Sequence, residues 1–259
     1  MSTFLWQSIA FGPIFSRRLG QSLGINLLPN DTKICSFNCI YCECGWTLEN
    51  SCFEKDAFLP ATEILAAIEH KLIDCREKES VIDSITFSGN GEPTLHPAFG
   101  EIINGLLLLR KRYYPSAVIT CLSNSTQLHR QDVLEALKKI DNPILKLDAG
   151  NEALFQLINK PTISVSQQEV VQNLKKLSGI AIIQTLFLKG KIDNLYFDNS
   201  SEDNIGAWLS NLEEINPKQV MIYSLDRETP QTELIRFTRE ELEQIAIRVR
   251  NKGFQTSVF

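Results

Sequence analysis

The sequence predicts an α/β protein, a partial (β/α)6 barrel in which helices cover an open, curved parallel sheet. Two observations lead to this prediction. Short apolar runs alternate along the chain with longer segments of helical periodicity, which is typical of βαβ units and a parallel sheet. The apolar runs are almost continuously hydrophobic, as are strands that are buried on both faces. Six units are two fewer than a closed eight-stranded barrel needs, so we expect the sheet to stay open.

The expected strands are six short segments, and an expected helix follows each of them. The strands cover residues 22–27, 84–88, 117–122, 144–148, 180–187 and 219–224, and the tail 254–259 is expected to add an edge strand. The helices cover residues 61–78, 97–112, 131–139, 166–177, 204–212 and 238–252. Cys75 falls on the apolar stripe of the first helix, so we expect it to be buried.

The length suits one large domain or two small ones, and because the sequence has no linker rich in Pro, Gly or Ser we expect a single domain over residues 1–259. A net charge of -5 and a pI near 5.4 disfavour nucleic acid as a partner, because proteins that bind it usually carry a basic stripe. No apolar run reaches the ~18 residues that a membrane span needs, and the first residues lack the features of a secretory signal. We therefore expect a cytoplasmic location and no membrane partner.

Three of the seven cysteines lie close together in the segment CSFNCIYC, as Cys35, Cys39 and Cys42. Thiolates at this spacing repel one another unless a cation holds them, and iron–sulfur clusters take thiolates from short runs of this kind. Three ligands in place of four leave one iron open, as in a catalytic metal site. The segment follows the first expected strand, at the carboxyl edge of the sheet, where parallel β/α folds build active sites.

A structural zinc site is the alternative at this motif. Cys44 follows Cys42 after one residue and would complete a set of four thiolates that seals the metal from chemistry. Zinc sites usually combine two separated pairs of ligands, and no second pair follows in the sequence. We therefore expect Cys44, Cys52, Cys75 and Cys121 to be dispensable for the metal.

Polar and glycine residues gather at the expected strand ends. The second strand runs into SGNGEPT at residues 88–94, where glycines let the backbone approach a ligand closely, although the same residues also make ordinary tight turns. The third and fourth strands end in short polar side chains that can bond to a ligand or cap a loop. A buried polar residue inside the fifth strand needs a partner. The candidate residues are Gly89, Asn90, Gly91, Glu92, Ser123, Asn124, Asp148 and Gln184.

The cysteine segment resembles the signature of the radical S-adenosylmethionine (SAM) superfamily, C-x3-C-x-Φ-C, in which Φ is aromatic and here is Tyr41. The resemblance implies that the three cysteines hold a [4Fe-4S] cluster whose open iron chelates the amino and carboxylate groups of SAM. Residues 89–92 resemble the superfamily's Gly-Gly-Glu motif, whose backbone binds the SAM amino group. Asn90 replaces the middle glycine, and its side chain is expected to matter little. The ends of the third and fourth strands resemble SAM-binding positions, where Asn124 and Asp148 are expected to act through their side chains.

A second resemblance covers nearly the whole chain. The segments GPIFSRRLGQSLGINLLP at residues 12–29, CECG at 42–45 and DAG at 148–150 are similar to a small, poorly characterised radical SAM family. That family is grouped with the wyosine-base (tRNA) synthases. Its first segment includes Arg17 and Arg18, which suit a carboxylate or phosphate and equally suit surface ion pairs. The sequence leaves the roles of these arginines and of Arg227 open.

These resemblances imply a radical SAM enzyme. An electron donor such as flavodoxin or ferredoxin would reduce the cluster, and SAM would be cleaved to methionine and a 5′-deoxyadenosyl radical that takes a hydrogen atom from a substrate. Hydrogen abstraction needs no diagnostic acid, base or nucleophile, so catalytic residues and substrate stay open. A tRNA base, a glycyl-radical partner enzyme, and a small molecule or peptide are the candidate substrates. A non-catalytic iron–sulfur or zinc protein is the alternative of another class.

Overall fold

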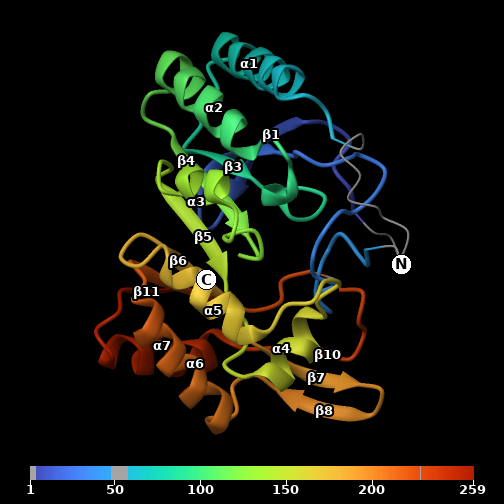
Figure 1. Ribbon diagram of the computed structural model, residues 1–259, viewed down its shortest axis with the longest axis vertical. Coiled ribbons are helices and arrows are strands. Elements are labelled where there is room, and N and C mark those ends of the chain that lie inside the picture. Colours follow the sequence, from blue (N-terminus) through green and yellow to red (C-terminus); the bar gives the residue numbers. More distant parts are fainter. Residues whose placement is uncertain (1–3, 48–57, 228) are drawn as a thin grey trace.

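The computed structural model describes residues 4–47, 58–227 and 229–259 as a curved α/β fold (Figure 1). Its main sheet has eight strands in the order β1-β2-β3-β4-β5-β6-β9-β11. The first pair is antiparallel and every other neighbouring pair is parallel. The strands are β1 (Ala10–Ser16), β2 (Gly20–Ile25), β3 (Ser84–Phe87), β4 (Val118–Ser123), β5 (Asn142–Lys146), β6 (Ile182–Leu186), β9 (Gln219–Tyr223) and β11 (Thr256–Val258).

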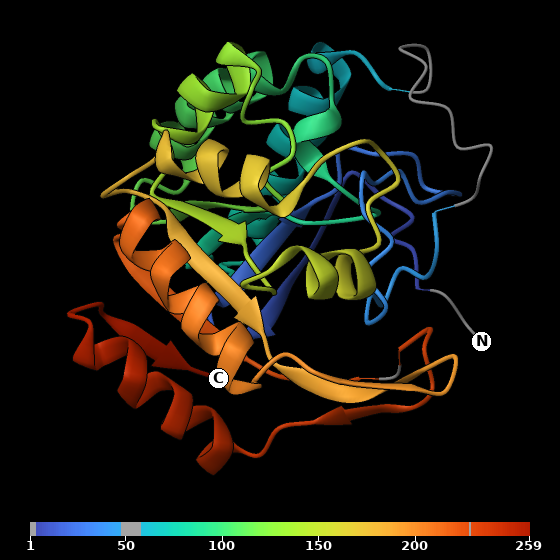
Figure 2. The same cartoon turned by 60° about the horizontal axis from the view of Figure 1, so that its bottom comes forward.

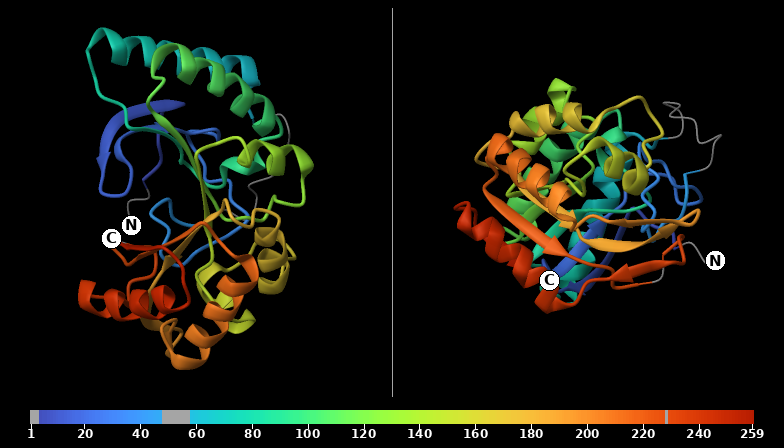
Figure 3. Two further views of the ribbon diagram at one scale, coloured as in Figure 1. Left: turned by 90° about the vertical axis from the view of Figure 1, so that its left-hand side faces the viewer. Right: turned by 90° about the horizontal axis from the view of Figure 1, so that it is seen from below.

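Helices cover the outer side of this curved sheet (Figures 2 and 3). They pack against it through apolar stripes, and Cys75 is buried on the stripe of the first helix, as predicted. The main core between sheet and helices includes the fully buried Trp208. None of the helices in the described ranges combines the length and hydrophobicity needed to cross a membrane. The helices are α1 (Ala61–Glu77), α2 (Phe99–Tyr113), α3 (Gln131–Leu137), α4 (Glu152–Asn159), α5 (Gln167–Lys175), α6 (Glu202–Ile215) and α7 (Arg239–Asn251).

The predicted fold class is confirmed. All six predicted strands and all six predicted helices are present, with ends that differ by a few residues, and the tail forms the edge strand β11. A short 3-10 helix, η2 (Pro93–Leu95), follows β3 and leads into α2. The successive β/α units place the carboxyl ends of the parallel strands along one edge of the sheet, which is the edge that carries the cysteine segment.

Strand β1 is not among the predicted strands, because Gly12 and Pro13 interrupt its sequence. Proline lacks a backbone N–H and is confined in sheets to edge strands and bulges. Both conditions hold here, since β1 is the edge strand and its register with β2 shifts between Phe11 and Ile14. The hairpin β1–β2 therefore adds an antiparallel wall to an otherwise parallel sheet.

A second sheet, in the order β10-β7-β8, is also absent from the prediction. Its strands are β7 (Leu188–Ile192), β8 (Leu195–Asp198) and β10 (Leu234–Arg236). The apolar run of β6 continues into β7, but the buried side chain of Asn199 binds the backbone where the two strands meet. Asn199 donates to the Leu186 carbonyl and accepts from the Leu188 N–H, both at 2.8 Å. These bonds turn the chain out of the main sheet at a point that hydrophobicity does not mark.

The inner face of the main sheet changes from apolar to polar toward the carboxyl ends of its strands. Ile144 pairs with Ile182, and two residues further along Lys146 pairs with Gln184. Alternate residues of a strand point to the same face, so these four side chains share one face. Ile144 and Ile182 form a small apolar cluster with Met221. The polar pair next to this cluster lines a cavity.

We predict that His96 makes stability sensitive to pH. Its Nδ1 accepts the Ala98 N–H at 3.1 Å, so its Nε2 carries the proton and donates to the Leu59 carbonyl at 3.1 Å. Burial lowers the pKa of His96 below the ordinary value of 6.5. His96 therefore binds a proton more readily in the unfolded chain than in the folded one. The stability that neutral His96 contributes to the fold is lost as pH falls below about 6.5.

His96→Asn keeps an acceptor for the Ala98 N–H but does not titrate. Urea denaturation at pH 7.5 and pH 5.5 should show a smaller loss of unfolding free energy for this variant than for the wild type. His70→Asn, on the exposed side of α1, controls for the substitution itself. An equal loss of unfolding free energy in His96→Asn and wild type would contradict the role of His96 as the group that titrates.

Candidate functional site

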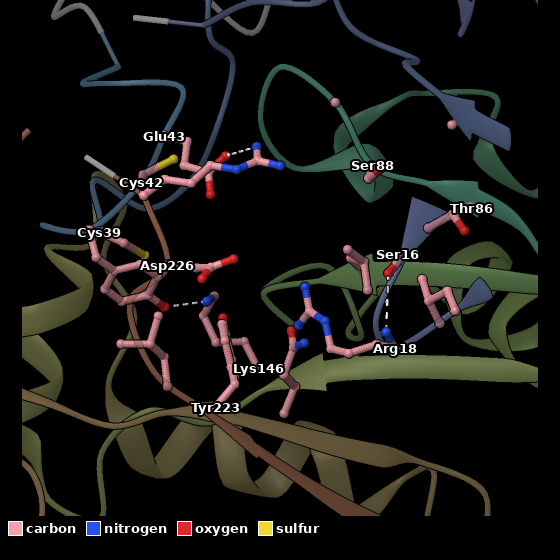
Figure 4. A pocket seen from close by; sticks show the side chains of 18 of the residues that line it. Ser16, Arg18, Cys39, Cys42, Glu43, Thr86, Ser88, Lys146, Tyr223 and Asp226 are labelled. Carbon is pink, nitrogen blue, oxygen red and sulfur yellow. Dashed lines mark hydrogen bonds and ion pairs between the residues drawn. The ribbon is translucent and has the colours of Figure 1, made fainter. Parts of the chain in front are cut away.

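A cavity of about 530 Å³ lies at the carboxyl ends of the parallel strands. Its walls come from the β1–β2 hairpin, from the cysteine segment after β2 and from the ends of β3, β4, β5, β6 and β9. Figure 4 shows Cys39 and Cys42 on one side of this space, with Lys146 and Tyr223 below and Arg18 opposite. All three cysteines of the predicted motif line the cavity.

The cysteine segment is held in place by backbone pairing with the loop after β3. Ile34 and Gly91 form an isolated parallel bridge, in which the Ile34 N–H donates to the Asn90 carbonyl and the Glu92 N–H to the Ile34 carbonyl, both at 3.0 Å. Gly91 has a φ of +135°, and a Cβ on it would lie 1.9 Å from the Ile34 oxygen. Only glycine permits this approach, so the predicted need for glycine after β3 has a definite cause.

The other side of the cysteine segment pairs with the C-terminal end of α4. The Ile40 N–H donates to the Ile158 carbonyl at 3.0 Å, and the Asn38 N–H donates to the Lys160 carbonyl at 2.9 Å. The segment is thus held between the loop after β3 and the end of α4, which come from different β/α units. Its position relative to the sheet is therefore set by tertiary contacts.

Three N–H donors lie against the sulfur atoms. The Phe37 N–H and the Asn124 Nδ2 donate to Cys35 Sγ at 3.4 and 3.6 Å, and the Asn159 Nδ2 donates to Cys39 Sγ at 3.4 Å. Hydrogen bonds to sulfur stabilise thiolates and tune iron–sulfur clusters. The donor set therefore fits metal-bound thiolates at Cys35 and Cys39.

Lys33 supplies a buried positive charge beside these cysteines. Its Nζ donates to the Gly45 carbonyl at 2.7 Å. Burial lowers the pKa of Lys33, but the Cys42, Cys35 and Cys39 thiolates outweigh burial and raise this pKa above its ordinary value. A cation fixed at this point offsets part of the negative charge that three thiolates bring into a buried site.

The cysteines differ in how readily they ionise. Burial raises the pKa of Cys35 to about 12 and also raises the pKa of Cys39. At Cys42 a hydrogen bond from the Cys44 thiol outweighs burial and, with Lys33, lowers the pKa to about 5. Cys35 and Cys39 therefore remain thiols at neutral pH unless a metal displaces their protons, which links metal binding to proton release.

The other cysteines lie outside the cavity wall wherever the structure describes them. Cys44 Sγ lies 3.4 Å from the Gly89 carbonyl oxygen, and Cys44 does not line the cavity. Cys75 and Cys121 are buried in the core, and Cys52 lies outside the described residues. Within the described ranges, no three His, Cys, Asp or Glu side chains are grouped for a single metal ion. The fit to a cluster therefore rests on the cavity, the sulfur-directed donors and Lys33.

Glu92 joins the loop after β3 to the end of β4. Its buried carboxylate accepts from the Asn124 N–H at 2.6 Å and from the Ser123 hydroxyl at 2.9 Å. Asn124 in turn donates to the Ser36 hydroxyl at 2.8 Å. Ser123 and Asn124 line the cavity as predicted, together with Glu92 and the two glycines, but much of their hydrogen-bonding capacity serves the protein itself.

Asn90 does more than the sequence suggests. Its side chain accepts from the Trp6 N–H at 2.8 Å and donates to the Trp6 and Pro29 carbonyls at 2.9 and 2.8 Å. The side chain therefore has a structural role that the sequence did not predict, because it ties the N-terminal segment to the loop after β3, while its small effect on SAM binding stays a prediction. Glycine at this position would lose all three bonds.

Asp148 is buried behind the cavity wall and does not line it. Its Oδ2 accepts from Asn159 at 2.7 Å and from the Tyr41 hydroxyl, and it lies 3.3 Å from Lys146 Nζ. The Leu186 N–H donates to its Oδ1 at 3.0 Å. The structure thus gives Asp148 and Tyr41 a positioning role, instead of the direct ligand contact expected for Asp148.

Lys146 is a cavity residue that sequence reasoning missed. It lies at the end of β5, where it contacts the Tyr41 hydroxyl and its Nζ is 4.8 Å from the centre of the Tyr41 ring. Burial lowers the pKa of Lys146, but Asp148 and then Tyr223 and Cys39 raise it well above its ordinary value, so Lys146 stays charged. The sequence did contain a signal for this residue, because Lys146 is a charged side chain inside the apolar run ILKLD.

Gln184 lines the cavity, is 8% exposed and has a buried Nε2 without a hydrogen-bond partner in the described chain. Buried amide groups normally have partners. The predicted need of this residue for a polar partner is thus unmet by the protein, and a ligand in the cavity would meet it. Among the predicted ligand contacts, Gln184 has the clearest unused donor.

Comparison with known proteins places this geometry in a family. The family model described as "Radical SAM superfamily" matches residues 30–194, which include the cysteine segment and the ends of β3, β4, β5 and β6. The chain therefore belongs to the radical SAM superfamily, whose members use a [4Fe-4S] cluster and SAM. The superfamily and the two cofactors that the sequence implies are confirmed.

Two curated relatives are similar over most of this chain. UPF0026 protein MJ1312 of Methanocaldococcus jannaschii is 32% identical over 82% of this chain, which spans 62% of that protein. GTPase Obg of Brachyspira hyodysenteriae is 30% identical over 90% of this chain, which spans 32% of that protein. The present sequence has no G-x4-G-K-[ST] phosphate-binding loop, so that name carries no activity to this chain.

Two solved structures share the fold. A radical SAM methyltransferase from Sphaerobacter thermophilus superposes with a TM-score of 0.65 and is 16% identical, covering 92% of this chain and 65% of its own. Native anSMEcpe, solved with bound AdoMet, has a TM-score of 0.58 and is 13% identical, covering 92% of this chain and 63% of its own. At these identities the likeness is one of fold.

We predict that Gly91→Val lowers cluster retention and SAM binding together. The valine side chain would strike the Ile34 carbonyl and push the cysteine segment away from the loop after β3. In anaerobically reconstituted protein we expect less bound iron and a SAM affinity that is roughly tenfold weaker or more. Gly206→Val is the matched control, since no atom lies within 4 Å of a Cβ there. Wild-type iron content and SAM affinity in Gly91→Val would contradict the role of this pairing.

Proposed function

We propose that this protein is a radical SAM enzyme that binds one [4Fe-4S] cluster through Cys35, Cys39 and Cys42. SAM binds beside the cluster, and a substrate binds over the inner face of the sheet. When bound, the cluster and SAM supply the chemistry, a reductive cleavage of SAM that yields a hydrogen-abstracting 5′-deoxyadenosyl radical. The protein itself holds these groups, positions the substrate and limits the access of water.

One observation supports this proposal most strongly: the three cysteines open onto the same cavity as the predicted ligand-binding strand ends. A structural metal site would not need such a space, whereas a cluster with an open iron needs room for a second ligand. The cavity volume of about 530 Å³ lies in the range of small-molecule and cofactor sites.

The residues around the cavity suggest how SAM is held. The loop from Gly89 to Gly91 runs directly beside the cysteine segment, so its backbone is available to a ligand that also reaches the open iron. Ser123 and Asn124 form the adjoining wall, and Gln184 offers its unused amide from β6. We assign SAM to this side of the cavity.

Lys146 provides a fixed positive charge next to Cys39. Its ion pair with Asp148 and its contact with Tyr41 keep the ammonium group at the cavity wall. Cluster thiolates and the SAM carboxylate are both negatively charged, so a cation that cannot move away stabilises both. Asp148 and Tyr41 act through Lys146 in this proposal.

The proposal also includes an electron donor and a class of substrate. A flavodoxin or ferredoxin is the class of protein that delivers single low-potential electrons. A tRNA base, a glycyl-radical partner enzyme, and a small molecule or peptide are the substrate classes, with the acidic balance of the chain against nucleic acid. The chain spans 32% and 62% of the length of the two curated relatives. The substrates and partners of those longer proteins are therefore not assigned to this chain.

We predict that anaerobically reconstituted protein contains roughly four iron atoms per chain, because the motif supplies the ligands of one cluster. Cys35→Ser, Cys39→Ser and Cys42→Ser should each lose the iron and sulfide. Cys44→Ser is the matched control and should retain them, since Cys44 does not line the cavity. Stoichiometric zinc without sulfide in anaerobically purified protein, or loss of iron in Cys44→Ser together with a wild type that binds no SAM, would support a closed structural site instead.

We predict that Gln184→Leu weakens SAM binding while the cluster remains. The substitution removes a buried donor that has no partner in the described protein, so stability should change little. Loss of one hydrogen bond to a ligand costs about 1–3 kcal/mol, which lowers affinity by roughly five- to a hundred-fold. Calorimetric titration of SAM into reconstituted protein measures this change.

Gln219→Leu, at the start of β9, is the control for a glutamine on the same sheet. It should bind SAM with wild-type affinity. If Gln184→Leu also binds SAM as the wild type does, SAM lies elsewhere in the cavity and Gln184 faces another ligand.

A further inference from the structure

Five basic side chains line the cavity, and four of them have partners within the described chain. Arg18 is the exception: its guanidinium makes no ion pair and no hydrogen bond with any described residue, and its Nη1 is buried without a partner. The partnered four are Lys33 with the Gly45 carbonyl, Lys146 with Asp148, Arg17 with Asp226 at 2.7 Å and Arg227 with Glu43 at 2.7 Å.

Arg18 is nevertheless held in a defined position. Its guanidinium lies over the Tyr223 ring, 4.8 Å from the ring centre, and its backbone N–H donates to the Ser16 hydroxyl at 3.3 Å. Figure 4 shows the guanidinium pointing into the cavity from the β1–β2 hairpin, opposite Cys39 and Cys42. An arginine is always charged and presents several donors in one plane. A fixed guanidinium that has no partner among the described residues therefore suits a ligand group with several acceptor oxygens.

We propose that Arg18 binds an oxyanion group, a carboxylate or a phosphate, of the substrate. This inference rests on the proposed function, because it takes SAM to occupy the side of the cavity next to the cysteines. It divides the cavity into a cofactor side and a substrate side, with Arg18 on the latter. The substrate is then an anionic molecule that is anchored away from the carbon that reacts.

The surroundings of Arg18 place such an anchor within reach of the cofactor side. Tyr223 lines the cavity under the Arg18 guanidinium, and Figure 4 shows Lys146 beside Tyr223, on the side toward Cys39. Tyr223 therefore lies between the two sides of the cavity. An anion on Arg18 would leave the rest of a small substrate over Tyr223, toward Lys146.

The cavity near Arg18 also has apolar surface for the body of a substrate. Leu19 and Leu122 line it, together with Phe259, and all three pack on the small apolar cluster of the inner sheet face. On the hairpin, Phe15 lines the cavity and is 70% exposed. A substrate that joins an anionic group to an apolar body would contact both Arg18 and these apolar side chains.

Equilibrium dialysis with radiolabelled phosphate and radiolabelled acetate, at constant ionic strength, tests the proposal on reconstituted protein saturated with SAM. We expect one saturable site per chain for at least one of the two anions, and the preferred anion distinguishes phosphate from carboxylate. Arg18→Gln should bind it roughly ten- to a hundred-fold more weakly. Arg18→Lys, which keeps the charge but loses the planar fork, should fall between them. Arg236→Gln, on the exposed part of β10, is the charge-matched control and should bind like the wild type.

Three results would overturn the proposal. These are the absence of saturable binding of either anion to the wild type, unchanged binding in Arg18→Gln, and anion binding that SAM abolishes. The last would mean that Arg18 holds the carboxylate of SAM itself. Iron content and SAM affinity are measured on the same samples. A wild-type protein that holds no cluster and binds no SAM would contradict the proposed function. The dialysis measures anion binding to Arg18 independently of that result. Thermal denaturation of each variant shows whether it is folded.

Discussion

The site depends on one backbone contact, the pairing of Ile34 with Gly91. It brings the segment that carries three cysteines against the loop after β3, although more than fifty residues separate the two in the sequence. The contact is possible because Gly91 has no Cβ and adopts a φ that other residues rarely reach. Pairing through backbone atoms leaves the cysteine side chains directed to the cavity, where a ligand can share them with the strand ends.

Buried polar residues then fix what this contact brings together. Glu92 connects the loop after β3 with β4, and Asp148 connects Lys146 at the end of β5 with Tyr41 and Asn159. Each of these carboxylates accepts several hydrogen bonds, so neither is an orphaned charge. This network holds the cavity wall that carries the cysteines. On the opposite wall, the Arg18 guanidinium has no hydrogen-bond partner among the described residues.

Strand-end reasoning located the site, while the side-chain contacts within it depend on the tertiary structure. Gly89, Gly91, Ser123 and Asn124 line the cavity, because parallel strands end at one edge. The side chains of Asn90 and Asp148 are bonded to other parts of the protein, which their places in the motifs do not indicate. A motif marks where a residue stands along the chain, whereas its hydrogen-bond partners come from residues that are distant in sequence.

Strand and helix periodicities and the spacing of the cysteines are local properties of the chain, so the fold class and the cysteine motif could be predicted from the sequence. The family followed from the resemblance of the cysteine segment to a known signature. That Lys146 stays charged beside Cys39, that Asp148 lies behind the wall and that Arg18 stacks on Tyr223 without an acidic partner in the described residues depends on tertiary packing. Burial and the distances between charges depend on how β1, β5 and β9 meet around the cavity, and no spacing within a single segment records that arrangement.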